Sequence, residues 1–350
     1  MSLTSLMTVA RDGALAQQAG LDLTGQNISN VNTPGYTRRV ALFEARPFGE
    51  GQTSGAAFAG IERMVDRFAQ GRTIDEAGKF ASADARSNAL NQAEGVLSID
   101  GTTPIAEKMD ALFRAFNNLA AYPGQLDVRK GVLLAGLELG DTIRSASDGL
   151  AQVSADTVTR AHELGDQANT DLDQIAKLND QIASAQALGD PAPALRDQRD
   201  QKLRSLADKL GARGIEDDNG RMTVFAMGVT LVDGNEASHV NVALAADGTL
   251  ATQVVRPRGG TLDVSPNALG GALAGLRQAH DVDIPSSVDA LDRLAYDVAT
   301  EVNRVHRQGY GLDDSTAGAA PGRDFFTFSS GTPPQKGAAG TLSVNSALGA

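Results

Sequence analysis

The sequence predicts a mainly α protein: an elongated multi-helix bundle with a long central helix and a small antiparallel β meander. Two observations lead to this fold class. Residues 126–188 contain no proline and keep apolar side chains close to helical spacing, which predicts one very long helix or two in tandem. Residues 215–260 alternate β-rich runs with Asn-Gly and Asp-Gly dipeptides, and this pattern indicates consecutive hairpins.

The amino-terminal segment carries an apolar stripe at coiled-coil spacing. Its positions alternate steps of four and three residues, which is the seam of a coiled-coil helix. Gln17 and Thr24 interrupt a stripe otherwise made of Leu3, Met7, Ala10, Ala14, Leu21, Ile28 and Val31. Such a stripe needs a partner helix from this chain or from another subunit, so we expect the segment to be disordered or loosely helical in the monomer.

A sharp turn follows this segment, within the sequence NISNVNTPGYTRR from Asn27 to Arg39. Thr33 precedes Pro34 and is therefore biased away from the α region. Gly35 supplies the positive φ that the third position of a type II turn requires. From the pattern alone, an ordinary amphipathic helix that ends in a turn remains an equal alternative.

Proline and glycine stops separate the remaining elements. We expect an extended connector at residues 40–60, helices at 61–97, 104–121, 193–210, 269–281 and 285–307, and a loop or small β-rich insert at 314–340 around Phe325, Phe326 and Phe328. Strands are expected at 222–225, 229–232 and 240–242. A break is expected around residues 283–285.

The helix predicted at 193–210 has an apolar face and a second face that mixes both charges. The charged residues are Arg196, Asp197, Arg199, Asp200 and Lys202. Because the acidic residues cancel the field that phosphate binding would need, we expect a solvated face with local ion pairs and no nucleic-acid site.

Composition argues against several classes of function. The 31 basic and 43 acidic residues give a formal charge of −12, which disfavours binding to nucleic acid or an anionic membrane. The chain has no cysteine and four widely spaced histidines, so no metal and no cofactor are expected. No apolar run reaches the roughly 18 residues of a membrane span.

Catalysis is not expected either. His306 with Glu301 or Asp313 is the one acid–base pair that can be suggested, and no nucleophile or phosphate-binding loop accompanies it. Acidic residues are abundant, so composition alone leaves a two-carboxylate hydrolase open, although nothing singles out a pair.

The turn region resembles a known signature. Asn27, Asn30, Asn32, Thr33, Pro34, Gly35 and Tyr36 resemble the amino-terminal motif shared by the axial proteins of the bacterial flagellum, which are rod, hook and hook-associated proteins. Residues 195–206 and the run from Gly270 to Asp313, including Glu301–Asn303, His306 and Gly309–Tyr310, resemble the hook-associated protein 1 (FlgK) family in particular.

The resemblance implies a structural, non-enzymatic role. Family members form the junction between hook and filament by self-assembly of axial helices, as copies in a ring with the hook protein on one side and hook-associated protein 3 on the other. They are secreted through the flagellar type III export apparatus and support motility. Another axial protein, from hook or rod, is the first alternative, and a non-flagellar helical scaffold is a weaker one.

The resemblance also implies a domain order. Residues 1–45 would be the axial assembly segment and half of an inner tube domain, 46–310 a helical rod domain with the meander at 215–260, and 311–350 a loop or the start of an outer or carboxy-terminal region. In the family, a further helical segment follows the part that resembles TLSVNSALGA, and we expect the partner of the amino-terminal stripe to lie there, past Ala350.

Overall fold

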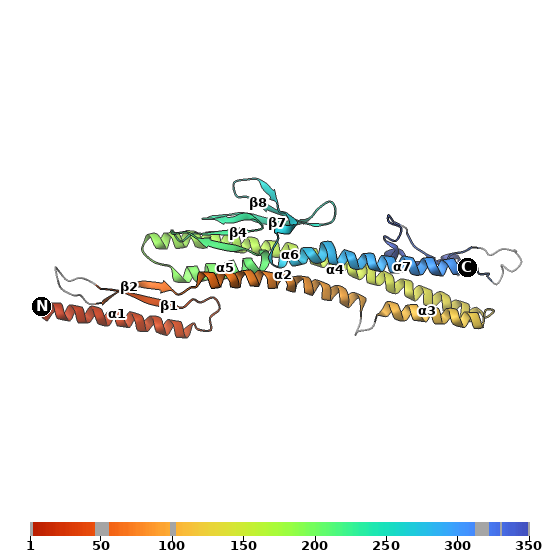
Figure 1. Ribbon diagram of the computed structural model, residues 1–350, viewed down its shortest axis with the longest axis horizontal. Helices are drawn as coiled ribbons and strands as arrows, with labels where there is room; N and C mark the ends of the chain where they lie inside the picture. Colours follow the sequence, from red (N-terminus) through yellow and green to blue (C-terminus); the bar gives the residue numbers. More distant parts are fainter. Residues whose placement is uncertain (1–2, 46–55, 99–102, 312–321, 330, 349–350) are drawn as a thin grey trace. The chain divides into compact units, whose positions relative to one another are not determined.

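The computed structural model confirms the mainly α class with small antiparallel sheets (Figure 1). It describes residues 3–45, 56–98, 103–311, 322–329 and 331–348. Two compact units are present. Unit 1 comprises Met1–Asp84, Ala161–Ala245 and Ala251–Gly275, and unit 2 comprises Ala85–Arg160, Ala246–Leu250 and Leu276–Ala350. The domain boundaries expected from the resemblance stay predictions.

Unit 1 combines helices with three sheets. Its helical elements are α1 (Leu3–Ser29), the start of α2 (Arg67–Leu97), the second part of α4 (Leu126–Ala187), α5 (Pro193–Leu210), η1 (Pro266–Ala268) and the start of α6 (Gly271–Gln278). Its sheets are the hairpin of β1 (Arg39–Ala45) and β2 (Ala56–Arg63), the sheet of β3 (Arg213–Glu216), β4 (Met222–Ala226), β5 (Val229–Asp233) and β6 (Glu236–Ala237), and the sheet of β7 (His239–Leu244), β8 (Leu250–Val255) and β9 (Thr261–Asp263).

Unit 2 is a helical bundle with a short carboxy-terminal strap. Besides the remaining parts of α2, α4 and α6, the bundle contains α3 (Pro104–Ala121), η2 (Ala279–Asp283) and α7 (Ile284–His306). The strap consists of β10 (Phe326–Thr327), α8 (Ala338–Thr341), β11 (Ser343–Val344) and η4 (Ser346–Leu348). The core buries Leu112, Leu139, Ile143 and Leu150 together with Phe325 and Phe326 of the strap. The predicted aromatic insert is therefore packed core in its described part.

The bounds of α3, α4 and α5 agree closely with the sequence predictions, and α4 is one continuous helix. The connector predicted at residues 40–60 is wrong in its described parts, because residues 39–45 pair with residues 56–63 as an antiparallel hairpin. The helix predicted from residue 61 begins instead at Arg67. Asp66 caps it there by accepting hydrogen bonds of 3.0 Å from the N–H groups of Phe68 and Ala69.

The break predicted around residues 283–285 is also wrong. The π-helical turn η2 joins α6 to α7 without leaving the helix. Pro285 follows this turn directly and has no N–H to donate into it. The wider turn, in which the Ile284 N–H bonds the Ala279 carbonyl, lies where the proline interrupts the regular helical hydrogen bonds. Arg86 holds the turn in place by donating two hydrogen bonds, of 2.7 and 2.9 Å, to the Asp283 carboxylate.

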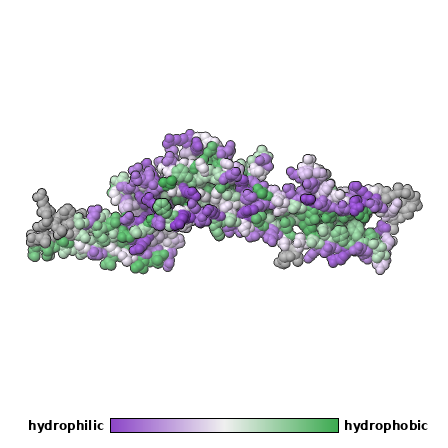
Figure 2. Space-filling view, viewed as in Figure 1, coloured by the Kyte–Doolittle hydropathy of each residue, from purple (hydrophilic) through white to green (hydrophobic). Residues whose placement is uncertain are grey.

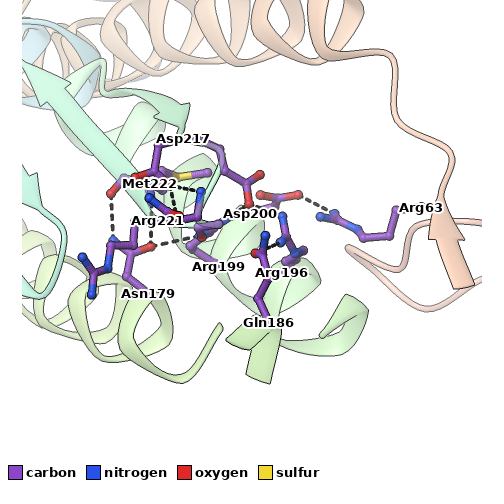
Figure 3. A network of polar contacts seen from close by, with 12 residues as sticks. Arg63, Asn179, Gln186, Arg196, Arg199, Asp200, Asp217, Arg221 and Met222 are labelled. Atoms are coloured by element: carbon purple, nitrogen blue, oxygen red, sulfur yellow. Dashed lines mark hydrogen bonds and ion pairs between the residues drawn. The ribbon is translucent and has the colours of Figure 1, made fainter. Parts of the chain in front are cut away.

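The charged face of α5 is the largest departure from the sequence predictions. Arg199 is fully buried, and Asp197 and Asp200 are also buried, so this face is not solvated. The Arg199 guanidinium donates to Asn179 Oδ1 at 3.0 Å and to the carbonyl of Gly220 at 2.6 Å, and it pairs with Glu216 at 2.9 Å (Figure 3). A buried charge persists when it is paired and hydrogen-bonded in this way.

Replacement of Arg199 by methionine should destabilise the protein by about 1–3 kcal/mol. It leaves the Gly220 carbonyl without its donor and removes one of two cations from Glu216 and one of two donors from the Asn179 oxygen. Urea unfolding measures the change. The control is Arg213→Met, which removes an exposed ion pair with Asp75 and should cost below about 1 kcal/mol. Equal losses in the two variants would show that the buried network contributes nothing specific.

Another buried carboxylate, that of Asp171, is expected to make unit 1 sensitive to acid. Burial alone would raise the pKa of Asp171, but hydrogen bonds from Lys209 and Ser205, together with Lys202, outweigh burial and lower that pKa. Lys209 Nζ and Ser205 Oγ lie 2.6 and 2.7 Å from Asp171 Oδ2. Because the folded pKa lies below the unfolded one, this stabilisation is complete above the unfolded pKa and is lost as pH falls through the folded pKa.

Asp171→Asn should therefore lower stability at neutral pH and flatten the loss of stability below about pH 4. The measurement is the free energy of unfolding in urea across the acid range. Asp180→Asn, on the exposed side of α4, is the control and should keep the wild-type slope. A wild-type slope in Asp171→Asn would assign the acid sensitivity to other groups.

Candidate functional site

Helix α1 exposes the apolar stripe that the sequence predicts. Its large members Leu3, Met7, Leu21, Ile28 and Val31 are between 68% and 78% exposed. Ala10 and Ala14 are exposed too. Figure 2 shows apolar side chains gathered over this helix. The predicted stripe, interrupted by Gln17 and Thr24, thus has no partner among the described residues.

A different face of α1 packs on the β1–β2 hairpin. Ala16 and Leu23 are buried, and a Cβ on Gly20 would lie 3.4 Å from the Phe43 ring. Sequence reasoning missed this second face. The sequence feature that could have predicted this face is a series of small or apolar residues at helical spacing that ends in an amide: Ala16, Gly20, Leu23 and Asn27.

The turn after α1 has the predicted form. The N–H of Tyr36 donates to the carbonyl of Thr33 at 3.2 Å, and Gly35 has φ of +80°. A side chain at Gly35 would also collide with Gln201, whose Nε2 donates to the Pro34 carbonyl at 2.5 Å. Glycine is therefore required both by its backbone angle and by the close approach of α5.

Asn27 joins α1 to strand β1. Its Nδ2 donates to the Arg39 carbonyl at 2.8 Å, and its Oδ1 accepts from the Arg39 N–H at 3.0 Å. The side-chain amide thus bonds one strand residue as a neighbouring strand would. The Tyr36 hydroxyl donates to the same Oδ1 at 2.8 Å. One amide therefore fixes both the turn and the start of the hairpin.

The other signature asparagines differ in their roles. Asn30 Nδ2 donates to the Gln26 carbonyl at 2.9 Å, and Asn30 Oδ1 accepts from the Thr33 hydroxyl at 3.1 Å, which closes the end of α1. Asn32 is exposed and makes no hydrogen bond to another described residue. The structure gives no account of asparagine at position 32.

Two arginines connect the hairpin to α5. Arg39 pairs with Asp197 at 3.0 Å while its guanidinium lies 4.9 Å from the centre of the Tyr36 ring. Arg63 pairs with Asp197 at 2.9 Å and with Asp200 at 2.5 Å (Figure 3). These four side chains are at most 13% exposed. We call them the carboxylate clamp.

The acid–base pair suggested for catalysis is occupied by structural contacts. His306 Nδ1 lies 2.8 Å from the Arg323 carbonyl, and Glu301 pairs with Arg304 at 2.9 Å. Asp313 lies outside the described residues. Across the described ranges, no group of three or more metal-ligating side chains lies together. None of the helices described is both long and apolar enough to cross a bilayer.

Comparisons with known proteins agree with this geometry. Residues 90–326 match the family model of the flagellar hook-associated protein FlgK helical domain, and residues 7–37 match that of the flagella basal body rod protein. The chain is 26% identical to flagellar hook-associated protein 1 of Bacillus subtilis, over 97% of this chain and 73% of that protein. It is also 26% identical to flagellar hook-associated protein 1 of Salmonella typhimurium, over 94% of this chain and 60% of that protein.

A solved structure shares the fold. The flagellar hook junction protein FlgK from Burkholderia pseudomallei matches with a TM-score of 0.63 at 22% identity, over 73% of this chain and 46% of that chain. The present chain thus spans about three quarters of the Bacillus protein and three fifths of the Salmonella protein.

The helical body and the amino-terminal motif define a structural protein of the bacterial flagellum. Within that class, the chain belongs to the flagellar hook-associated protein 1 (FlgK) family, because the family model covers most of its length. This confirms the resemblance seen in the sequence.

Loss of the Asn27 amide should loosen α1 from the hairpin. Asn27→Ala leaves the Arg39 N–H and carbonyl unpaired, so hydrogen exchange of that N–H should become faster, and about 1–3 kcal/mol of local stability should be lost. Amide exchange followed by NMR measures the effect. Asn32→Ala, in the same motif but without a bond, should behave as wild type, and matching exchange rates in both variants would contradict the assigned role.

Proposed function

We propose that the chain is a subunit of the junction between hook and filament and that it assembles with copies of itself through the exposed stripe of α1. The observation that supports this proposal is the stripe itself. It leaves Leu3, Met7, Leu21 and Ile28 of α1, and Val31 just after the helix, in water, while another face of α1 is already packed. An exposed apolar face of this kind marks an interaction surface.

The energetics favour a partner helix. Full burial of one Leu, Ile, Met or Val side chain contributes about 1.5–3 kcal/mol. The stripe therefore supplies a strong driving force once neighbouring axial helices offer opposing ridges. The stripe of α1 has no partner among the described residues, so we expect this helix, although held to the β1–β2 hairpin by another face, to be loosely ordered in the free monomer and to order fully on polymerisation.

The remaining partners follow from the resemblance. The copies would form a ring with the hook protein on one side and hook-associated protein 3 on the other, after secretion through the flagellar type III export apparatus. The turn and the carboxylate clamp would set the direction in which α1 leaves the body of unit 1, since they bond it to both the hairpin and α5. The role is non-enzymatic and uses no cofactor.

Leu21→Lys tests the stripe. Leu21 is 72% exposed, so the variant should change the stability of the monomer by less than about 0.5 kcal/mol. A charge in the seam should abolish assembly in a bacterium that carries this variant as its single copy of the gene. Swimming and the fraction of hooks that bear filaments measure assembly, and the amount of variant in the culture medium reports export separately.

The matched control is Gln26→Lys, which adds the same charge to α1 outside the stripe. It should leave swimming and filament attachment unchanged. Normal filaments with Leu21→Lys would refute the proposal, as would failure of both variants at normal export, because the stripe would then have no special part.

A further inference from the structure

Strand β3 is the edge of its sheet, and one side of it is unpaired. The sheet order is β3-β4-β5-β6, so β3 has a neighbour on one side only. Directly after β3, the N–H of Asp217 donates to the Arg221 carbonyl at 2.8 Å, on the side of β4. Backbone groups of an antiparallel strand alternate in direction. The N–H and carbonyl groups of Gly214 and Glu216 therefore point away from β4.

A groove of about 510 Å³ runs beside this edge. Gly214, Ile215 and Glu216 line it, together with the end of β2, the first turns of α2, one face of α5 and Pro191 before that helix. Its apolar lining consists of Ile61, Val65, Ile74, Leu203, Ile215 and Met222 along with two prolines. The groove thus combines free backbone donors and acceptors with apolar contacts, the two features used in recognition by strand addition.

The charges of the groove indicate what can enter it. Three carboxylates, of Glu62, Asp200 and Glu216, are matched by three guanidinium groups, of Arg63, Arg67 and Arg196. The lining is therefore neutral, although the chain as a whole carries −12. A neutral, apolar-lined edge complements an uncharged strand. A charged side chain would lose its water there and would find no free charge of opposite sign in the lining to compensate.

We infer that this groove binds an extended, uncharged segment of a partner protein, with β-branched apolar residues alternating with small polar ones, as an added strand on β3. The segment would exchange backbone hydrogen bonds with Gly214 and Glu216. Its apolar side chains would face Ile215, which is 66% exposed, and the walls of the groove. This interaction is separate from the stripe of α1 and does not depend on it.

The probe is the peptide acetyl-Thr-Val-Thr-Val-Thr-Val-amide, added to the full chain. On binding, the N–H groups of Gly214 and Glu216 should exchange more slowly, as measured by NMR, while residues of β6 stay unchanged. Two N-methylated versions of the peptide sharpen the test. Because amides alternate along a strand, methylation of one set should abolish binding and methylation of the other set should preserve it.

A matched pair of variants tests the groove itself. A Cβ at Gly71 in the groove, or at Gly95 further along α2, would meet no atom within 4 Å, so a side chain can be started at either position without a clash. Gly71→Trp should weaken peptide binding by at least about tenfold, and Gly95→Trp should leave it unchanged.

Three results would overturn the inference. They are equal binding of both methylated peptides, normal binding to Gly71→Trp, and no slowing of exchange up to the solubility limit of the peptide. Protection of the two amides that rises with protein concentration alone would reject the separate partner and assign the edge to a second copy of this chain.

Discussion

Four helix-to-strand connections depend on the same interaction: a helical asparagine that bonds both the N–H and the carbonyl of one strand residue. Asn27 bonds Arg39, Asn169 bonds Val240, Asn179 bonds Met222 and Asn303 bonds Phe326. Each amide takes the place of an adjacent strand, so a short sheet can rest against a helix without an unpaired edge at that point. The hairpin, the other two sheets of unit 1 and the strap of unit 2 are all attached to helices in this way.

Helix α5 is also attached to strand segments by buried polar side chains, in this case charged ones on two of its sides. Arg199 bonds the loop before β4 on one side, and Asp197 and Asp200 bind the arginines of the hairpin on the other. Every group in such a network needs its partner, because an unpaired charge in the interior is strongly destabilising. Because hydrogen bonds are directional, these polar contacts restrict the position and rotation of α5 within unit 1 more than apolar packing alone would.

The parts of the fold that could be predicted from the sequence are those set by residues close together along the chain. Proline and glycine stops place α3, α4 and α5, and the four–three spacing identifies the exposed stripe of α1. The sequence could not reveal that Arg199 is buried, because alternating charges on a helix look the same whether water or protein surrounds them. The hairpin at 39–63 was missed for a similar reason: its pairing is between residues far apart, and glycine-rich sequence hides it. Asn27 was recognised as part of a motif, while its partner Arg39 became visible only in three dimensions.

The asparagine connections also bear on how the protein ages. An asparagine amide presents a donor nitrogen on one side and an acceptor oxygen on the other, and slow hydrolysis to aspartate would replace the donor nitrogen by a second acceptor oxygen. That oxygen would face the strand carbonyl, so a contact that holds sheet to helix would become repulsive without any change in side-chain size. A subunit that is not renewed after it has been incorporated accumulates such hydrolysis events with time. Hydrolysis at any of these four asparagines would therefore weaken the attachment of a sheet or of the strap to its helix.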